Sequence, residues 1–146
     1  MHLLPYDGGP LPDLPYAPGW PHADTAAGLA YAEATDGRPG AWSWLVVDDD
    51  GRIAGECGVK GAPGPDGLVE IGYGLAGPSR GRGLGGRAVA ALVELLAAEP
   101  AVRRIDAHVV VDNIASRRVL ERLGFTVVEV GPEELRYSKA VQPPVV

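Results

Sequence analysis

The apolar positions of this chain follow two spacings, and the change between them predicts where strands give way to a helix. Apolar residues alternate in short runs over residues 41–47, 52–59 and 68–75, which predicts three strands. They recur every three or four residues over 84–99, which predicts an amphipathic helix that Pro100 ends. The middle of the chain is therefore expected to form strands first and a long helix afterwards.

The same two spacings continue to the end of the chain. Alternating β-branched and apolar residues predict a strand at 104–111, and residues 126–131 and 135–141 are predicted to form a final hairpin. A short helix is predicted at 115–123, and Gly124 is well placed to end it in a left-handed conformation. Strands and helices thus alternate along the second half of the chain, as they do in mixed α/β domains.

The first forty residues have a different character. Residues 1–21 hold six prolines, which fix φ and lack an N–H, so we expect an extended or irregular arm there. Residues 22–35 carry alanines at helical spacing and predict a first helix. We interpret 1–146 as a single α/β (α+β) domain, with 142–146 as a loose tail.

The composition is that of an ordinary globular domain, with 46% hydrophobic and 22% charged residues. The single cysteine, Cys57, excludes an internal disulfide and a multi-cysteine zinc site. No apolar run approaches the ~20 residues that span a membrane, and the N-terminus lacks the layout of a signal peptide. We therefore expect a cytoplasmic protein with no membrane partner. The aspartates at 48–50 lack a plausible ligand set, so no metal site is predicted.

Charge is distributed unevenly along the chain. The net charge of −6 argues against general affinity for nucleic acid. Residues 1–79 are strongly acidic, with 3 Lys and Arg against 11 Asp and Glu, whereas residues 80–146 have 10 against 8. The chain turns basic at residue 80, which favours a polyanionic ligand there, and its acidic half could attract a cationic substrate.

The turn to basic residues coincides with a glycine-rich stretch. Residues 80–87 contain four glycines and three arginines, and they lie between the strand predicted at 68–75 and the helix predicted at 84–99. Glycines let a backbone curl closely around a ligand, and a helix start presents unpaired N–H groups and partial positive charge. This combination predicts an anion site, with phosphate as the favoured anion.

Three kinds of phosphate loop can be compared with this stretch. A Walker-type loop needs a Lys followed by Ser or Thr, and no such pair is present. Gly81, Gly83 and Gly86 match a dinucleotide fingerprint literally, but Pro78 and its neighbours separate them from the strand. A nicotinamide-dinucleotide-binding protein therefore stays only a distant alternative.

The third kind of loop matches in two places. Arg80-x-x-Gly83-x-Gly85 resembles the acetyl-CoA pyrophosphate loop of the GNAT family of N-acetyltransferases. Downstream, the asparagine, short helix and Gly-Phe of residues 113–125 resemble that family's second motif, and residues 70–75 look like its fourth strand. The sequence of these motifs is most similar to the ribosomal-protein alanine acetyltransferase branch, and the resemblance covers roughly residues 41–140.

This resemblance implies a fold and a donor. The fold would be a mixed, mostly antiparallel sheet flanked by helices, with a splayed gap between the strands at 68–75 and 104–111. Acetyl-CoA would be the cosubstrate, and an amine would accept the acetyl group directly, without a covalent enzyme intermediate. Protein N-termini, amino acids, polyamines and antibiotics are all open as acceptors. A second subunit could complete the acceptor side, so a homodimer is also open.

The resemblance also implies roles for individual residues. The pyrophosphate would lie against the loop around Gly81, on backbone N–H groups and arginines. A backbone N–H of Leu75 or Ala76 would stabilise the developing oxyanion. Asn113 and Ser116 would contact the pantetheine or its thiol end. The residues implied to hold the pyrophosphate are Arg80, Gly81, Arg82, Gly83, Gly85 and Gly86.

The proton-transfer groups are less well defined. Glu70 matches the family's catalytic glutamate and is the first candidate base, with a solvated strand carboxylate as the plain alternative. Glu56 on the neighbouring strand is the reserve candidate. Leu120 stands where the family commonly has a tyrosine acid, so Ser116, Tyr73 and Tyr137 are the candidate donors to the thiolate. Because of Leu120, a non-catalytic acyl-CoA-binding or regulatory module on the same fold is the second hypothesis.

Overall fold

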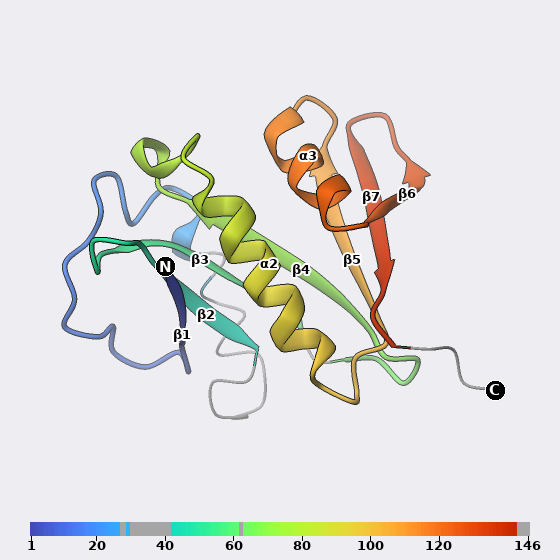
Figure 1. Cartoon of the computed structure of the whole chain (residues 1–146), viewed down its shortest axis with the longest axis horizontal. Coiled ribbons are helices and arrows are strands. Elements are labelled where there is room, and N and C mark those ends of the chain that lie inside the picture. Colours follow the sequence, from blue (N-terminus) through green and yellow to red (C-terminus); the bar gives the residue numbers. More distant parts are fainter. Residues whose placement is uncertain (27–28, 30–41, 62, 143–146) are drawn as a thin grey trace.

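The structure is a computed structural model that describes residues 1–26, 29, 42–61 and 63–142. Its described strands form one seven-stranded sheet in the order β1-β2-β3-β4-β5-β7-β6, and two helices lie in front of it in Figure 1. The elements are β1 (His2–Pro5), β2 (Ser43–Val47), β3 (Ile53–Val59), β4 (Leu68–Leu75), the 3₁₀ turn η1 (Gly77–Ser79), α2 (Leu84–Ala97), β5 (Arg104–Val110), α3 (Ile114–Arg122), β6 (Thr126–Val130) and β7 (Glu134–Ala140).

The sheet splits between its two central strands. Among the described strands, β4 and β5 pair in parallel and all other neighbours pair antiparallel. The parallel pairing covers Leu68–Ile71 and Arg104–Ala107 only, so the two strands separate beyond Ile71. In Figure 1 they meet at the lower right and diverge toward α3. The predicted mixed sheet and its splayed gap are both confirmed.

The predicted strands and helices from residue 43 onward lie within two residues of the observed ones. The N-terminal arm differs, because residues 2–5 form the edge strand β1, which pairs with β2. These residues are extended, as the prediction of an extended or irregular arm allows, but their pairing into a strand was not predicted. Pro5 is compatible with the strand because it lies at the end of an edge strand. Of the helix predicted at 22–35, residues 27–28 and 30–35 lie outside the described residues.

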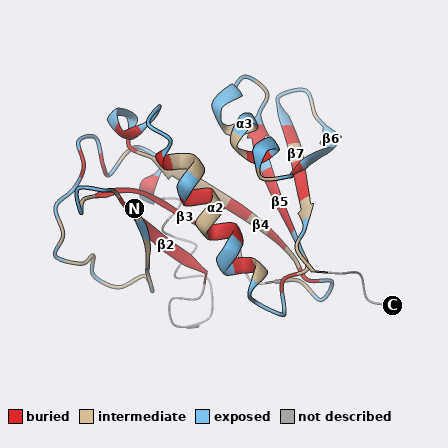
Figure 2. Ribbon diagram, viewed as in Figure 1, coloured by how far each residue is buried: buried red, intermediate tan, exposed pale blue. Residues whose placement is uncertain are grey.

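α2 packs an apolar face onto the front of the sheet. Its buried residues are Leu84, Ala88, Val89, Leu92, Val93 and Leu96, which recur at helical spacing. They share a core cluster with Trp44, Val46 and Ile71 of the strands beneath. α3 adds Leu120, which is fully buried in the same cluster. Figure 2 shows this buried layer running under both helices.

The N-terminal arm packs on the opposite face of the sheet. Leu45 points away from its β2 neighbours Trp44 and Val46, because successive strand residues face opposite sides. It forms a second cluster with Trp20, Ile53 and Ala76, against which several apolar side chains of the arm pack. The arm is therefore a packed cover, and it carries His22 to the rear face of β3 and β4.

No helix in the described part of the chain combines the length and the apolar composition needed to cross a membrane.

Candidate active site

The glycine-arginine loop leads directly into α2. Gly83 is the N-cap residue of the helix, and the first backbone bond of the helix runs from the Arg87 N–H to the Gly83 carbonyl, 3.2 Å apart. The N–H groups of Leu84, Gly85 and Gly86 precede that bond and have no carbonyl partner within the helix. This row of donors lies at the positive end of the helix dipole, which is the geometry of an anion site.

Two glycines of this loop have a backbone conformation that favours glycine. Gly81 and Gly83 both have φ of 76°, and an added Cβ would meet nothing within 4 Å, so the backbone conformation rather than crowding selects glycine. At Gly85, an added Cβ would lie 3.4 Å from the Leu75 side chain. This is an ordinary van der Waals distance, and it shows that the start of α2 lies beside the end of β4, where the gap opens.

The three arginines of the loop have different partners. The Arg80 Nε donates to the Leu75 carbonyl at 3.3 Å, which holds this side chain at the end of β4. Arg82 is exposed. Arg87 pairs with Asp49 at 2.9 Å, and Asp49 also accepts from the N-terminal amine at 2.7 Å. Arg87 and the amine hold the pKa of the Asp49 carboxyl well below its usual range. Of the three arginines, Arg87 is the one that pairs with a carboxylate in the described part of the structure.

Backbone N–H groups of β4 also face the gap. The Ala76 N–H donates to the Ala54 carbonyl at 2.8 Å, on the β3 side of β4. Because successive residues of a strand direct their N–H groups to opposite edges, the N–H groups of Tyr73 and Leu75 point toward β5. β5 has already separated there. Of the two predicted oxyanion donors, Leu75 is the one whose N–H faces the gap.

A pair of hydroxyl groups lies between β4 and α3. The hydroxyls of Tyr73 and Ser116 are hydrogen bonded to each other. Burial raises the pKa of Tyr73, and the hydrogen bond to Ser116 partly offsets that rise. Asn113 caps α3, since its Oδ1 accepts from the Ser116 N–H at 3.1 Å. Tyr137 is fully buried, and its hydroxyl contacts Arg117 and Glu121 of α3.

The two candidate glutamates have contrasting surroundings. The Glu70 side chain is 34% exposed, and its Oε1 accepts from His108 Nδ1 at 2.7 Å and from Lys60 Nζ at 3.3 Å. Glu56 is 5% exposed, and its Oε2 lies 2.9 Å from His22 Nε2. The Glu56 Oε1 is buried and has no hydrogen-bond partner. The Glu70 carboxylate therefore has two donors near the surface, whereas the buried Glu56 carboxylate has a partner for one of its two oxygens.

The protonation of His22 follows from its neighbours. The Asp24 backbone N–H donates to His22 Nδ1 at 3.2 Å, so Nδ1 carries the lone pair. Nε2 is then the protonated nitrogen of a neutral imidazole, and it donates to Glu56 Oε2. His22 thus orients one oxygen of the Glu56 carboxylate and leaves the other oxygen unused.

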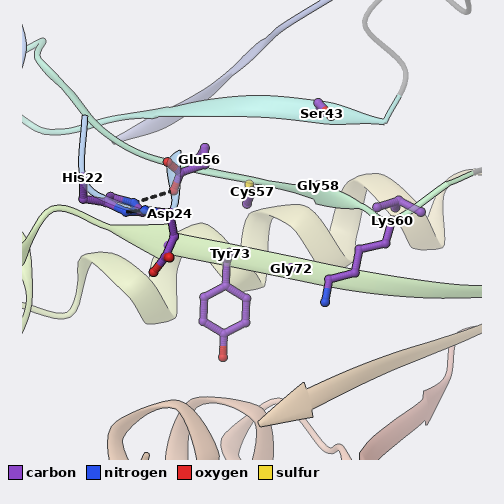
Figure 3. Close-up of a pocket in the computed structure, with 11 residues that line it drawn as sticks. His22, Asp24, Ser43, Glu56, Cys57, Gly58, Lys60, Gly72 and Tyr73 are labelled. Atoms are coloured by element: carbon purple, nitrogen blue, oxygen red, sulfur yellow. Dashed lines mark hydrogen bonds and ion pairs between the residues drawn. The ribbon is translucent and has the colours of Figure 1, made fainter. Parts of the chain in front are cut away.

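A cavity of about 290 Å³ opens over β3 and β4 beside this pair. Figure 3 shows His22, Asp24 and Glu56 at one end and Lys60 at the other, while the Tyr73 ring points away toward α3. The cavity is also lined by the glycines Gly58, Gly72 and Gly74. It therefore has charged ends, and three of the residues along it carry no side chain.

His22 was not among the predicted site residues. It lies 34 residues from Glu56 in the chain, and no motif spacing connects the two. Only the course of the arm across the rear of the sheet brings them together. Within the described residues, no group of three or more His, Cys, Asp or Glu side chains is arranged to hold a metal ion.

A sheet that splays at a parallel strand pair, with a glycine-rich helix start beside the gap, defines an acetyltransferase fold. The chain belongs to the GNAT acetyltransferase family, since residues 12–126 match the family described as "Acetyltransferase (GNAT) domain". A curated relative from Bacillus subtilis (strain 168), described as "Uncharacterized N-acetyltransferase YjdG", is 32% identical over 111 residues, covering 73% of this chain and 66% of that protein. The family membership predicted from the two motifs is confirmed.

Solved structures share the fold. The ribosomal-protein-S5-alanine acetyltransferase from Vibrio fischeri superposes with a TM-score of 0.59 and 24% identity, over 67% of this chain and 60% of that one. The microcin C7 self-immunity acetyltransferase MccE, solved with acetyl-CoA and AMP, superposes with a TM-score of 0.53 and 24% identity. The match covers 61% of this chain and 55% of the MccE chain. This chain spans just under two thirds of YjdG, and a smaller share of these two solved chains.

Proposed function

We propose that this protein transfers the acetyl group of acetyl-CoA to an amine. The observation that carries the proposal is the position of the helix start: the unpaired N–H groups of α2 lie beside the gap between β4 and β5. An elongated donor with an anionic end fits such an arrangement, because the phosphates can bind the helix start while the acyl arm lies in the gap. MccE, which shares the fold, was solved with acetyl-CoA, and this supports the choice of donor.

The donor's pyrophosphate would bind the loop around Gly81 and the N–H groups of Arg82, Gly83, Gly85 and Gly86. Arg80 and Arg82 would add positive charge. The open space beside Gly81 and Gly83 supports this assignment, since a ligand can approach their backbone without meeting a side chain.

In the reaction, the amine nitrogen attacks the thioester carbonyl carbon, and the C–S bond then breaks. The Leu75 N–H would donate to the oxygen that gains charge. The thiolate takes a proton to leave as the CoA thiol, and the hydrogen-bonded pair Tyr73 and Ser116 is the proposed source. Glu70 stays a predicted base, with Glu56 in reserve. Asn113 would act through its cap, which positions Ser116.

A non-catalytic acyl-CoA-binding module is the second candidate. Leu120 favours it, because this residue is fully buried and supplies no hydroxyl where the family commonly has a tyrosine. Tyr73 favours catalysis instead, because its hydroxyl pairs with Ser116 of the same helix α3. A nicotinamide-dinucleotide protein is no longer supported, since the mostly antiparallel sheet differs from a doubly wound parallel sheet.

An acceptor screen separates these candidates. Purified protein is first titrated with acetyl-CoA in a calorimeter and then incubated with acetyl-CoA and a panel of amines, with thiol release as the readout. The proposal expects acetyl-CoA binding together with amine-dependent release. Binding without release over the whole panel would support the binding module, and no binding would overturn both candidates.

A further inference from the structure

We infer that the Glu56 carboxylate, oriented by His22, binds the amino group of the acceptor as an ammonium ion and takes its proton. The acceptor would occupy the cavity on the rear face of β3 and β4, opposite α2. The inference rests on the proposed acetyl transfer, and it assigns the residue that takes the proton, Glu56, and the residue that positions it, His22.

The position of Glu56 in the sheet supports this role. Glu56 is paired across the strands with Gly74, and a Cβ built on Gly74 would lie 2.7 Å from Glu56 Oε2. The carboxylate therefore lies over the backbone of Gly74, the residue just before Leu75. Glu70 is five residues from Leu75 in a regularly paired strand, which is about 16 Å of backbone at 3.3 Å per residue. Of the two glutamates, Glu56 lies beside the proposed oxyanion donor.

One oxygen of the Glu56 carboxylate is buried without a hydrogen-bond partner. Within the described residues, three buried side-chain polar atoms have no partner: the indole nitrogens of Trp20 and Trp42, which are donors, and Glu56 Oε1. A buried carboxylate oxygen without a donor is unfavourable, so a bound group that supplies an N–H or O–H would stabilise it. An ammonium group has three N–H donors and a positive charge. It complements a carboxylate whose other oxygen is already bound to His22.

The proton transfers balance with this assignment. An ammonium acceptor gives one proton to Glu56 Oε1 and becomes a neutral amine with a free lone pair. Attack on the thioester forms the C–N bond, and loss of the thiolate breaks the C–S bond. The nitrogen loses a second proton as the amide forms, and this loss balances the proton that the thiolate gains. Glu56 then returns its own proton to solvent through the cavity. One ammonium and one acetyl-CoA thus yield an amide, a thiol and a proton.

The cavity selects for a narrow, cationic acceptor. Asp24 lies at the same end as Glu56, so the field there is negative. Lys60 at the far end is paired with Glu70. The glycines of β3 and β4 leave space over the strands, in a cavity of about 290 Å³. A small aliphatic amine or the first residues of a peptide would fit.

The test compares Glu56→Gln with Glu94→Gln, the same change on the exposed side of α2. Acetyl-CoA affinity should stay within twofold in both variants. With the best amine of the screen, Glu56→Gln should lower kcat at pH 7 by about 10²–10⁴-fold, the usual contribution of a general base. The loss should shrink as pH approaches the acceptor's own pKa, because the amine then arrives unprotonated. Glu94→Gln should match the wild type.

His22 is a positioning residue, and its test uses a conservative variant. His22→Ala removes the donor to Glu56 Oε2 and should lower kcat about tenfold or more, whereas His22→Gln keeps an N–H donor and should restore most of it. Should Glu56→Gln fail to fold, Gly74→Ala replaces it, because its Cβ displaces the carboxylate. It should lower kcat in the same way.

Two outcomes overturn the inference while leaving the proposed function intact: full turnover by Glu56→Gln, or a loss in Glu70→Gln at pH 7 that Glu56→Gln does not share. If the wild type acetylates no amine, the proposed function itself fails. If the wild type does acetylate amines, its rates with a small aliphatic amine and with the N-terminal amino group of a short peptide show which of the two the cavity accepts.

Discussion

The thiol of Cys57 lies next to the Glu56 carboxylate in sequence but in a different environment. Burial raises the pKa of Cys57 to about 12, with a smaller contribution from the negative charge of Glu56. Since the thiolate is the reactive form, the folded protein holds this cysteine inert at neutral pH. An acetyl group carried on Cys57 is therefore disfavoured, in agreement with direct transfer from donor to amine.

Cys57 should react with a thiol reagent only after unfolding. At pH 8, the native protein is expected to leave its thiol unmodified by dithionitrobenzoate over an hour, and the protein in guanidinium chloride should release one equivalent at once. Folding also keeps the proton on this thiol, so stability should fall as pH rises above the pKa of about 8.5 that the thiol has when unfolded. Rapid modification of the native protein would contradict this account.

Tyr73 shows how a residue can take over a task that the family places elsewhere. Leu120 fills a core position, and the Tyr73 hydroxyl reaches Ser116 of α3 from β4. Because burial raises its pKa, Tyr73 keeps its proton at neutral and mildly alkaline pH and can donate it.

Tyr73→Phe should therefore lower kcat by about 10–100-fold with little change in acetyl-CoA affinity, since only the hydroxyl is removed. Steady-state kinetics with calorimetry measures both quantities, and Leu120→Phe serves as a packing control at the family's tyrosine position. Unchanged kcat in Tyr73→Phe would assign the thiolate's proton to Ser116 or water.

At the scale of elements, the start of α2 combines a backbone conformation that favours glycine with the N–H groups proposed to bind phosphate. Gly83 is the N-cap at φ 76°, and the N–H groups that follow it are the proposed phosphate donors. Gly51, in the turn between β2 and β3, has φ of 77° and equally open surroundings. The two positions therefore carry the same conformational demand, and only one of them lies at the proposed site.

Gly83→Ala and Gly51→Ala should each destabilise the protein by about 1–2 kcal/mol, because L-residues disfavour this region. Only Gly83→Ala should also weaken acetyl-CoA binding, by tenfold or more. Denaturant unfolding and calorimetry on both variants give the comparison. Equal acetyl-CoA affinity in the two variants would contradict the assignment of this loop to the acetyl-CoA site.

The elements differ in how well sequence patterns predict them. β3, β4 and α2 were predictable because their apolar residues repeat at one spacing, and the loop at Gly83 because its backbone needs glycine. β1 was missed since four residues beside prolines show no periodicity. The contact between His22 and Glu56 was also out of reach, because it depends on how the arm crosses the sheet.

At the scale of the molecule, the sheet separates two routes. The donor is proposed to enter the gap from the side of α2 and α3, and the acceptor from the rear face, which the arm covers. Trp20 anchors that arm in the second apolar cluster and is 5% exposed, two residues before His22. The stability of the arm and the position of His22 should therefore change together.

Trp20→Ala should destabilise the protein by about 3–5 kcal/mol and lower kcat more than it lowers acetyl-CoA affinity. Tyr16→Ala is the matched control, since Tyr16 stacks edge-on against Trp20 at 5.0 Å but is 46% exposed. It should cost about 1 kcal/mol or less. Urea unfolding and steady-state kinetics measure the two effects. If Trp20→Ala lowered acetyl-CoA affinity as much as kcat, separate entry routes for acetyl-CoA and the amine would be contradicted.

The central claim is that the gap beside Leu75 and the helix start at Gly83 together support acetyl transfer to an amine. The most direct measurement is the stoichiometry of the reaction: thiol released from acetyl-CoA against acetylated amine formed, by absorbance and mass spectrometry in one sample. The account predicts one acetylated amine for each thiol, and no thiol without the amine. Thiol release without acetylated amine, or acetyl-CoA recovered intact with every amine, would contradict it.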